Sequence, residues 1–199
     1  MPVLQLDSIG KQFRGQWLFQ NLNTRIEPGA GLAITGPNGS GKSTLLLCLA
    51  ELVRPDLGQL QWSEFPKGRP ALAAPGMELP GEFTLRELLD FHFTLNPILA
   101  EYDPFRELED SGLRASSSLQ IRHFSSGMTQ KLRLVLALLS DSSLLLLDEP
   151  HSHLDSHGQT WFQNLLPKVS NNRCLVIASN DPAEYSHCRN TLSLQGLKP

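Results

Sequence analysis

The sequence predicts an α/β fold with a mainly parallel sheet, an N-terminal antiparallel β layer and a helical insertion. Three observations lead to this prediction. Short apolar runs alternate with helix-forming segments after residue 30. Residues 36–44 fit the phosphate-binding pattern G-x-x-x-x-G-K-[ST], between a strand-like run and a helix-forming one. An apolar run over residues 144–147 ends in two carboxylates, Asp148 and Glu149. At 199 residues, we expect one domain over residues 1–199.

The N-terminal layer is predicted from residues 3–26, which contain short apolar runs separated by polar residues, before the turn cluster at residues 27–31. Phe13 is an aromatic residue in a polar setting. Composition leaves two interpretations open for it: a core residue that packs under a turn, or a platform on which a nucleobase stacks.

The phosphate loop follows a predicted strand at residues 32–35 and opens a helix that we expect to run from Lys42 to about Val53. Its glycines permit positive φ, so that successive backbone N–H groups converge on an anion, and the helix N-terminus adds partial positive charge. A Gly-rich turn would fit this pattern by chance on the order of once in a hundred chains of this length. Lys42 is expected at the β/γ-phosphates and the Ser43 hydroxyl at Mg²⁺. The predicted nucleotide contacts are Gly36, Pro37, Asn38, Gly39, Ser40, Gly41, Lys42, Ser43 and Thr44.

The middle of the chain predicts a change from strands to helices. Residues 59–62 alternate as a strand does, and residues 71–74 are either a buried strand or a flexible junction. Thr84 and Glu87 have the capping-box spacing, which begins a helix that ends at Asn96-Pro97. Its predicted apolar surface consists of Leu85, Leu88, Leu89, Phe91 and Phe93. An amphipathic segment at 101–114 and a polar loop at 114–118 complete a helical insertion over residues 83–125. With the long helix predicted at 127–140, the helical subdomain covers approximately residues 83–140.

The carboxylates after the apolar run lie where the carboxyl end of a buried parallel strand opens into a site. Asp148 is expected to complete the Mg²⁺ shell with Ser43, and Glu149 to orient and deprotonate the attacking water. The alternative is a core strand that runs into a charged turn, and the upstream phosphate loop favours the functional interpretation. The last third of the chain predicts a strand at 174–178, helices at 156–168 and 182–188, and an edge strand at 191–194.

The composition excludes several functions. The net charge is −3 and no Lys/Arg-rich block is present, so we expect no nucleic-acid partner. The three cysteines have no metal-ligand spacing, and buried free thiols in a reducing compartment are the expectation. The first residues lack the features of a signal peptide, and the longest apolar stretches fall far short of the ~20 residues that span a bilayer. These observations predict a cytoplasmic protein.

Residues 124–131, Phe-Ser-Ser-Gly-Met-Thr-Gln-Lys, resemble the L-S-G-G-Q signature of the ATP-binding subunits of ABC transporters, and the resemblance extends from Leu4 to about Leu194. It implies a P-loop NTPase core that uses ATP and Mg²⁺ in a head-to-tail dimer. In that dimer Ser125, Ser126 and Gly127 of one copy face the phosphate loop of the other across ATP. It also implies a separate polytopic membrane subunit, which would hold the protein on the inner face of the cell membrane. It favours base stacking for Phe13.

The resemblance also places a dimer contact at residues 152–155. A metal site is therefore not expected at the nearby His151, His153 and His157.

Three positions depart from the family pattern. Pro75 stands where the family has a glutamine that links Mg²⁺ to the helical insertion, and no Gln occurs between Gln61 and Gln120. Asn180 replaces the switch histidine, and an amide cannot carry the charge of imidazolium. Met128 replaces the signature Gln, with little expected effect. Glu149 is retained, so we expect an active but slow ATPase with Glu149, Lys42 and Asn180 in the catalytic roles.

Two other functions compete with that of a transporter subunit. Non-transport members of the family usually carry two fused nucleotide domains or a long coiled-coil insertion, and neither is present in this sequence. A regulatory module that binds ATP with little turnover is suggested by Pro75 and Asn180 but disfavoured by Glu149. The compact length and short insertion are similar to those of small exporter-type ATPases.

Overall fold

The computed structural model describes residues 3–64, 66–114 and 116–195; Ala115 of the expected polar loop falls outside them. The central element is a five-stranded sheet among these residues, with the strand order β5-β6-β7-β3-β8 and parallel pairing throughout. Its strands are β3 (Leu32–Thr35), β5 (Ala71–Ala73), β6 (Leu144–Asp148), β7 (Cys174–Ala178) and β8 (Asn190–Ser193). The predicted parallel sheet and its C-terminal edge strand are confirmed. Residues 71–73 form a strand, which decides between the two alternatives for that segment.

A second, antiparallel sheet has the order β2-β1-β4 and consists of β1 (Leu4–Phe13), β2 (Gln16–Ile26) and β4 (Leu57–Trp62). The antiparallel layer was predicted, but its strands are longer than expected. The β1–β2 ladder continues through several register shifts, and Ser8 and Asn21 adopt positive φ without ending their strands. The hairpin turns at Arg14 and Gly15, whose φ values of 50° and 75° suit a two-residue hairpin loop.

The α-helices are α1 (Lys42–Leu49), α2 (Leu85–Leu95), α3 (Pro104–Asp110), α4 (Ser126–Leu139) and α5 (Ser156–Ser170), with a 3-10 turn at Ile121–His123. The capping box predicted for α2 is present: Thr84 and Glu87 each bond the backbone N–H of the other. α1 ends at Leu49, earlier than the predicted Val53, and Glu51 beyond it adopts a left-handed φ of 59°.

The helix predicted at residues 182–188 is wrong. This segment forms turns, because polar side chains at its start bond the backbone in place of a helical ladder. Ser179 Oγ accepts from the N–H of Asp181 at 2.9 Å, and Asp181 Oδ1 accepts from the N–H of Ala183 at 2.9 Å.

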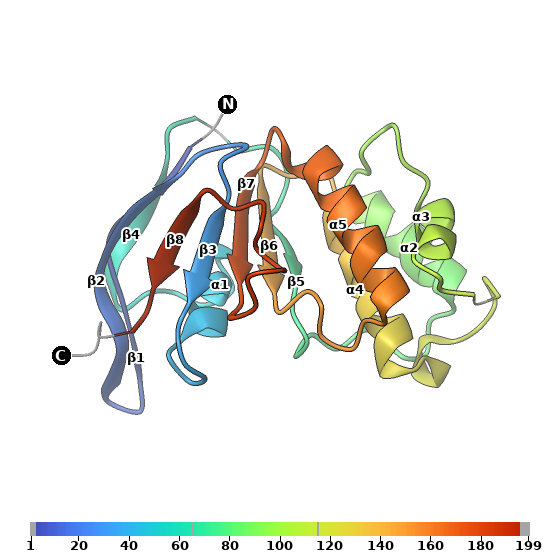
Figure 1. The fold of residues 1–199 in the computed structure, drawn as a ribbon, viewed down its shortest axis with the longest axis horizontal. Coiled ribbons are helices and arrows are strands. Elements are labelled where there is room, and N and C mark those ends of the chain that lie inside the picture. Colours follow the sequence, from blue (N-terminus) through green and yellow to red (C-terminus); the bar gives the residue numbers. More distant parts are fainter. Residues whose placement is uncertain (1–2, 65, 115, 196–199) are drawn as a thin grey trace.

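Two hydrophobic cores lie on opposite faces of the parallel sheet, and β6 contributes to both. Leu144 and Leu146 pack with the antiparallel layer and α1, whereas Leu145 and Leu147 pack with the helices on the other side. Figure 1 shows this order of layers, with the antiparallel sheet at one end and α2 and α3 at the other. Because β6 is buried on both faces, its sequence is a continuous apolar run, and Asp148 stands at the end of this run.

The predicted apolar surface of α2 is only partly confirmed. Leu85, Leu88 and Leu89 are buried. Phe91 is 53% exposed, because it lies off the face of α2 that these three leucines form. All three cysteines are free thiols, with Cys48 and Cys174 buried and Cys188 half-buried. Burial raises the pKa of Cys48 and Cys174 to about 11 and that of Cys188 to about 12, so the thiols are uncharged at neutral pH.

Candidate functional site

The phosphate loop joins β3 to α1 and depends on three glycines with positive φ: Gly36 at 145°, Gly39 at 75° and Gly41 at 101°. At Gly41 a side chain is also excluded sterically, because an added Cβ would lie 3.0 Å from the ring of Phe19. Gly41 is the N-cap of α1 and has no side chain to accept a bond. By contrast, each of the other α-helices has its first N–H groups bonded by an N-cap side chain, from Thr84, Asp103, Ser125 and Asp155. The start of α1 therefore keeps N–H donors for an anion.

The Lys42 side chain bonds the backbone of the phosphate loop that precedes it. Its Nζ donates to the carbonyl oxygen of Gly36 at 2.7 Å and lies 3.5 Å from that of Pro37, and the residue is only 6% exposed. The ammonium is thus held by the backbone of the loop, where a phosphate would meet it. Ser40 is buried beneath the loop, and no hydrogen-bond partner for its hydroxyl lies within the described residues.

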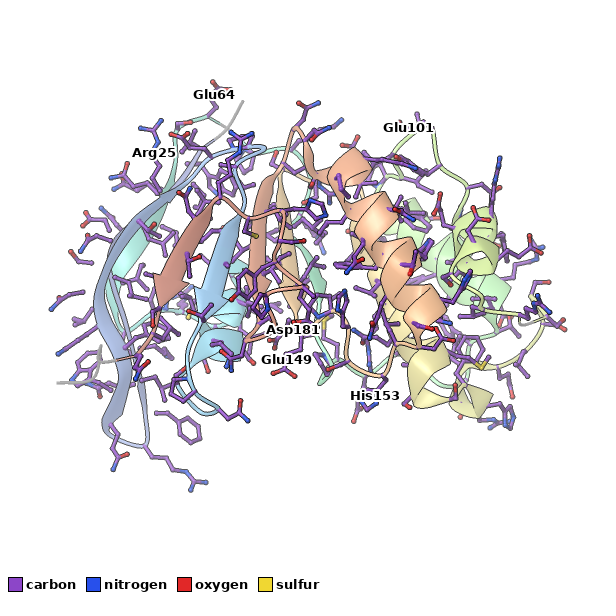
Figure 2. The ribbon with its side chains drawn as sticks, viewed as in Figure 1. Arg25, Glu64, Glu101, Glu149, His153 and Asp181 are labelled. Carbon is purple, nitrogen blue, oxygen red and sulfur yellow. The ribbon has the colours of Figure 1, made fainter. Side chains whose placement is uncertain are left out.

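The two carboxylates after β6 differ in environment. Asp148 is buried and hydrogen-bonded to the Ser43 hydroxyl; burial raises the pKa of its carboxyl group, while that bond lowers it. Glu149 is exposed, has a left-handed φ of 43°, and donates its N–H to the carbonyl oxygen of Ala178 at 2.9 Å. Figure 2 shows Glu149 and Asp181 at the same end of the parallel sheet. This edge therefore combines a hydroxyl, a buried carboxylate and an exposed carboxylate.

A cleft of about 490 Å³ lies over the loop and is lined by Phe13, Leu18, Asn38, Gly39, Gly41, Lys42, Ser43, Thr44 and Glu149. Phe13 comes from the tip of the β1–β2 hairpin and is 61% exposed, with the Arg14 guanidinium 5.3 Å from its ring centroid. The interpretation of Phe13 as a core residue is therefore wrong. Leu18 was not predicted as a site residue, because the pattern of apolar residues in β2 does not reveal that the β1–β2 hairpin lies over the phosphate loop.

Asn180 follows β7 and contacts the loop directly. Its Oδ1 accepts from the N–H of Gly36 at 3.1 Å, across 144 residues of sequence. Pro75 follows β5, the strand that pairs with β6, so it lies on the same edge of the sheet as Asp148. The structure thus brings both unusual positions to the edge that carries the cleft.

The signature-like residues lie elsewhere in the same chain. Ser125 caps α4 by accepting from the N–H of Met128 at 3.2 Å, and Ser126 is exposed. Gly127 packs against the carbonyl oxygen of His153, which an added Cβ would approach to 2.9 Å. Within the ranges that the structure covers, none of Ser125, Ser126 and Gly127 lines the cleft. Figure 1 shows the start of α4 on the helical side of the molecule, apart from the β3–α1 loop.

The three histidines do not converge. His151 is buried, His153 is exposed with a φ of 61°, and His157 Nε2 lies 3.0 Å from the carbonyl oxygen of Asp110. The described part of the chain contains no group of three His, Cys, Asp or Glu side chains that could hold a metal ion. Across the same residues, no helix has the length and apolar character needed to span a bilayer.

Residues 19–152 match the family described as ABC transporter. The chain belongs to this family. It is 36% identical to the cytochrome c biogenesis ATP-binding export protein CcmA of Nitrosococcus oceani, over 94% of this chain and 90% of that protein. It is 27% identical to the zinc import ATP-binding protein ZnuC of Rhizobium johnstonii, over 85% of this chain and 55% of the relative. The fold matches the dimeric structure of MJ0796, a bacterial ABC transporter cassette, with a TM-score of 0.83 at 19% identity, over 96% and 93% of the two chains.

Membership of this family identifies the chain as the ATP-binding subunit of a transporter, with ATPase activity. Members of the family work as dimers together with membrane components. The expected P-loop NTPase core is confirmed by the α/β architecture and its structural neighbours.

Proposed function

We propose that two copies of this chain close head to tail around two ATP molecules and that hydrolysis reopens them, moving a substrate through a separate polytopic membrane subunit. The observation that carries this proposal is the separation within one chain of the phosphate cleft from Ser125, Ser126 and Gly127. Ser126 is exposed at the first turn of α4, where its hydroxyl and the N–H groups that Ser125 does not cap can form a second anion pocket. A second copy can place that pocket over the γ-phosphate bound by the first.

Most residues of the cleft have a role in this scheme. The loop N–H groups and Lys42 bind the β- and γ-phosphates, and Phe13 stacks on the base. Ser43 and Asp148 fit Mg²⁺, because a hydroxyl and a carboxylate already meet there and both are oxygen ligands. When bound, Mg²⁺ neutralises charge on the phosphates. Glu149, exposed in the cleft, orients a water and takes its proton, and Asn180 hydrogen-bonds the γ-phosphate.

Slow turnover is part of the proposal. Asn180 donates a neutral hydrogen bond where an imidazolium would add charge, and Pro75 has neither a ligand atom nor an N–H. Each lost charge-assisted bond costs about 1.5–2.5 kcal/mol in the transition state, or roughly ten- to a hundred-fold in rate.

The Asn180→His variant should therefore hydrolyse ATP roughly ten- to a hundred-fold faster than the wild-type chain, because protonated imidazole supplies the missing charge. Steady-state phosphate release from the purified subunit with its membrane partner measures this, with Asp181→Asn as a neighbouring control. An unchanged or lower rate in Asn180→His would show that Asn180 does not limit turnover.

We propose that the membrane subunit docks in an apolar groove of about 480 Å³ between the end of α1, β5, α2 and α4. Leu52, 65% exposed, and Met77 both line it. The carbonyl oxygen of Met77 accepts from Arg133 Nε at 2.8 Å, so the groove adjoins the segment that carries Pro75 to the cleft edge. An occupant of the groove would contact that segment, which suits a partner whose movement is coupled to ATP.

The Leu52→Glu variant should lose co-purification with the membrane subunit in detergent by about tenfold or more, because a charge enters the apolar contact. ATP binding by the isolated subunit should not change. Leu57→Glu, at a leucine that is 45% exposed on β4, is the matched control and should co-purify normally. Equal recovery of both variants would exclude the groove as the docking surface.

The direction of transport that we propose is export, since the CcmA relative matches over more of both chains than ZnuC. We place the subunit on the cytoplasmic face of the membrane, as one domain over residues 1–199 with a helical subdomain at approximately 83–140. ATP hydrolysis by vesicles that contain both subunits, and its dependence on Glu149, tests the function directly. A chain that binds ATP with no Glu149-dependent turnover would instead be a regulatory module.

A further inference from the structure

A buried carboxylate outside the cleft contacts both segments that carry hydrolytic residues. Glu184 is 5% exposed, and its Oε1 accepts from the backbone N–H of His151 at 2.6 Å. It also hydrogen-bonds the Ser179 side chain. His151 follows Glu149 by two residues, and Ser179 immediately precedes Asn180. One side chain therefore joins the turn after β6 to the turn after β7.

The turn after β6 requires such support because its backbone is strained. Glu149 has a φ of 43°, a strained conformation that a residue other than glycine keeps only when its surroundings fix it. The turn is closed by the bond from the N–H of Ser152 to the carbonyl oxygen of Glu149 at 2.9 Å. Glu184 holds the N–H of His151 inside that turn. A shift of the turn would move the Glu149 carboxylate directly.

The Ser179 segment is in turn bonded to β3, the strand that precedes the phosphate loop. Ser179 donates its N–H to the carbonyl oxygen of Ile34 at 3.1 Å, and its hydroxyl accepts from the N–H of Asp181 at 2.9 Å. Both bonds bracket Asn180, whose Oδ1 meets the N–H of Gly36. Because the Ser179 oxygen already accepts, its proton is available to Glu184. The carboxylate thus links the turn after β6 to the turn after β7, and the second of these turns is bonded to β3.

We propose that Glu184 is a positioning residue for ATP hydrolysis, which holds the Glu149 turn and the Asn180 segment in one register by accepting hydrogen bonds from both. Its contribution is geometric, since it does not line the cleft and its hydrogen bonds are to His151 and Ser179. Burying a carboxylate at a place without a ligand is otherwise unfavourable, and burial raises the pKa of Glu184 while the two hydrogen bonds lower it. This inference rests on the proposed role of Glu149 as the base.

Steady-state kinetics of the complete transporter test the proposal. Glu184→Ala should lower kcat about 10- to 100-fold with KM for ATP within about threefold of wild type, because misplacement of the base affects the chemical step more than binding. Glu184→Gln keeps an acceptor oxygen for His151 and should restore kcat to within about threefold. Leu165→Ala, a 4% exposed core residue on α5, controls for lost stability and should leave kcat unchanged. If Glu184→Ala does not fold, Ser179→Ala removes the bond to Glu184 together with the bond that Ser179 Oγ accepts from the N–H of Asp181, and should lower kcat about 3- to 10-fold.

A double variant separates this inference from the proposed function. If Glu184 positions Glu149, then Glu184→Ala should cost less in the Glu149→Gln background, where the base is already absent and only Asn180 can be misplaced, than in the wild type. A loss on adding Glu184→Ala to Glu149→Gln that is as large as the loss in the wild-type background, a wild-type kcat in Glu184→Ala, or a Glu184→Gln variant as slow as the alanine variant would overturn the positioning role. A Glu149→Gln variant with wild-type activity would contradict the proposed function, whereas the single variants Glu184→Ala and Glu184→Gln test the positioning role in the wild-type background.

Discussion

Replacing Lys42 by alanine is expected to abolish measurable ATP turnover, with a fall of about 100- to 1,000-fold. The ammonium is held by the carbonyl oxygens of Gly36 and Pro37 at the centre of the phosphate loop, and it is the one cation that lines the described cleft. Its removal leaves the phosphates with backbone donors alone. Affinity for ATP, measured by equilibrium titration, should fall about tenfold or more as well.

Lys11→Ala is the matched control for Lys42. Lys11 lies outside the cleft, paired with Asp56 at 3.1 Å, so its loss should leave both turnover and ATP affinity within about twofold. Retention of turnover by Lys42→Ala would mean that the loop does not bind the reacting phosphates.

The Glu149→Gln variant is expected to separate binding from hydrolysis. The amide keeps the size and a hydrogen bond of the carboxylate but cannot accept the proton of water, so turnover should fall about 100- to 1,000-fold while ATP affinity stays within about threefold. The variant should also accumulate as an ATP-bound dimer, which size-exclusion chromatography with and without ATP detects.

The outcome for Glu149→Gln distinguishes a hydrolytic subunit from a regulatory module that binds ATP with little turnover. Equal rates in the variant and the wild type would show that Glu149 is not the base, and the regulatory alternative would then explain Pro75 and Asn180. A variant that also fails to bind ATP would indicate damage to the turn that begins at the φ of 43°, and Glu149→Asp would then repeat the measurement.

The fold was predictable where local pattern and burial agree. The strands β6 and β7 are buried on both faces and appear in the sequence as continuous apolar runs, which led to the parallel sheet. The helix prediction for residues 182–188 was wrong because Ser179 and Asp181 bond nearby backbone groups, an effect that apolar spacing does not reveal. Strand lengths in the antiparallel layer were underestimated, since polar residues there mark bulges.

The site was predictable to the extent that it is built from contiguous motifs. The loop, Asp148 and Glu149 lie together as expected because a parallel sheet gathers strand ends at one edge. The orientation of Phe13 depends on how the hairpin lies over the loop, a contact between distant segments. Glu184 gave no signal, because a glutamate in a polar stretch shows its burial only when the turns after β6 and β7 meet around it.

The central claim is that one chain supplies only half of each hydrolytic site, and mixing two inactive variants tests it most directly. Lys42→Ala disables the phosphate loop, and Ser126→Asp places a negative charge at the exposed first turn of α4, where it favours the helix but repels the γ-phosphate. In a mixed dimer one site carries both defects and the other carries none.

Equal mixing in the presence of the membrane subunit should therefore restore roughly a quarter of the wild-type ATPase rate, since half of the dimers form with one intact site of two. Each variant alone should remain inactive. A mixture that stays as inactive as its components, although both variants fold and form dimers, would contradict a site shared between two copies.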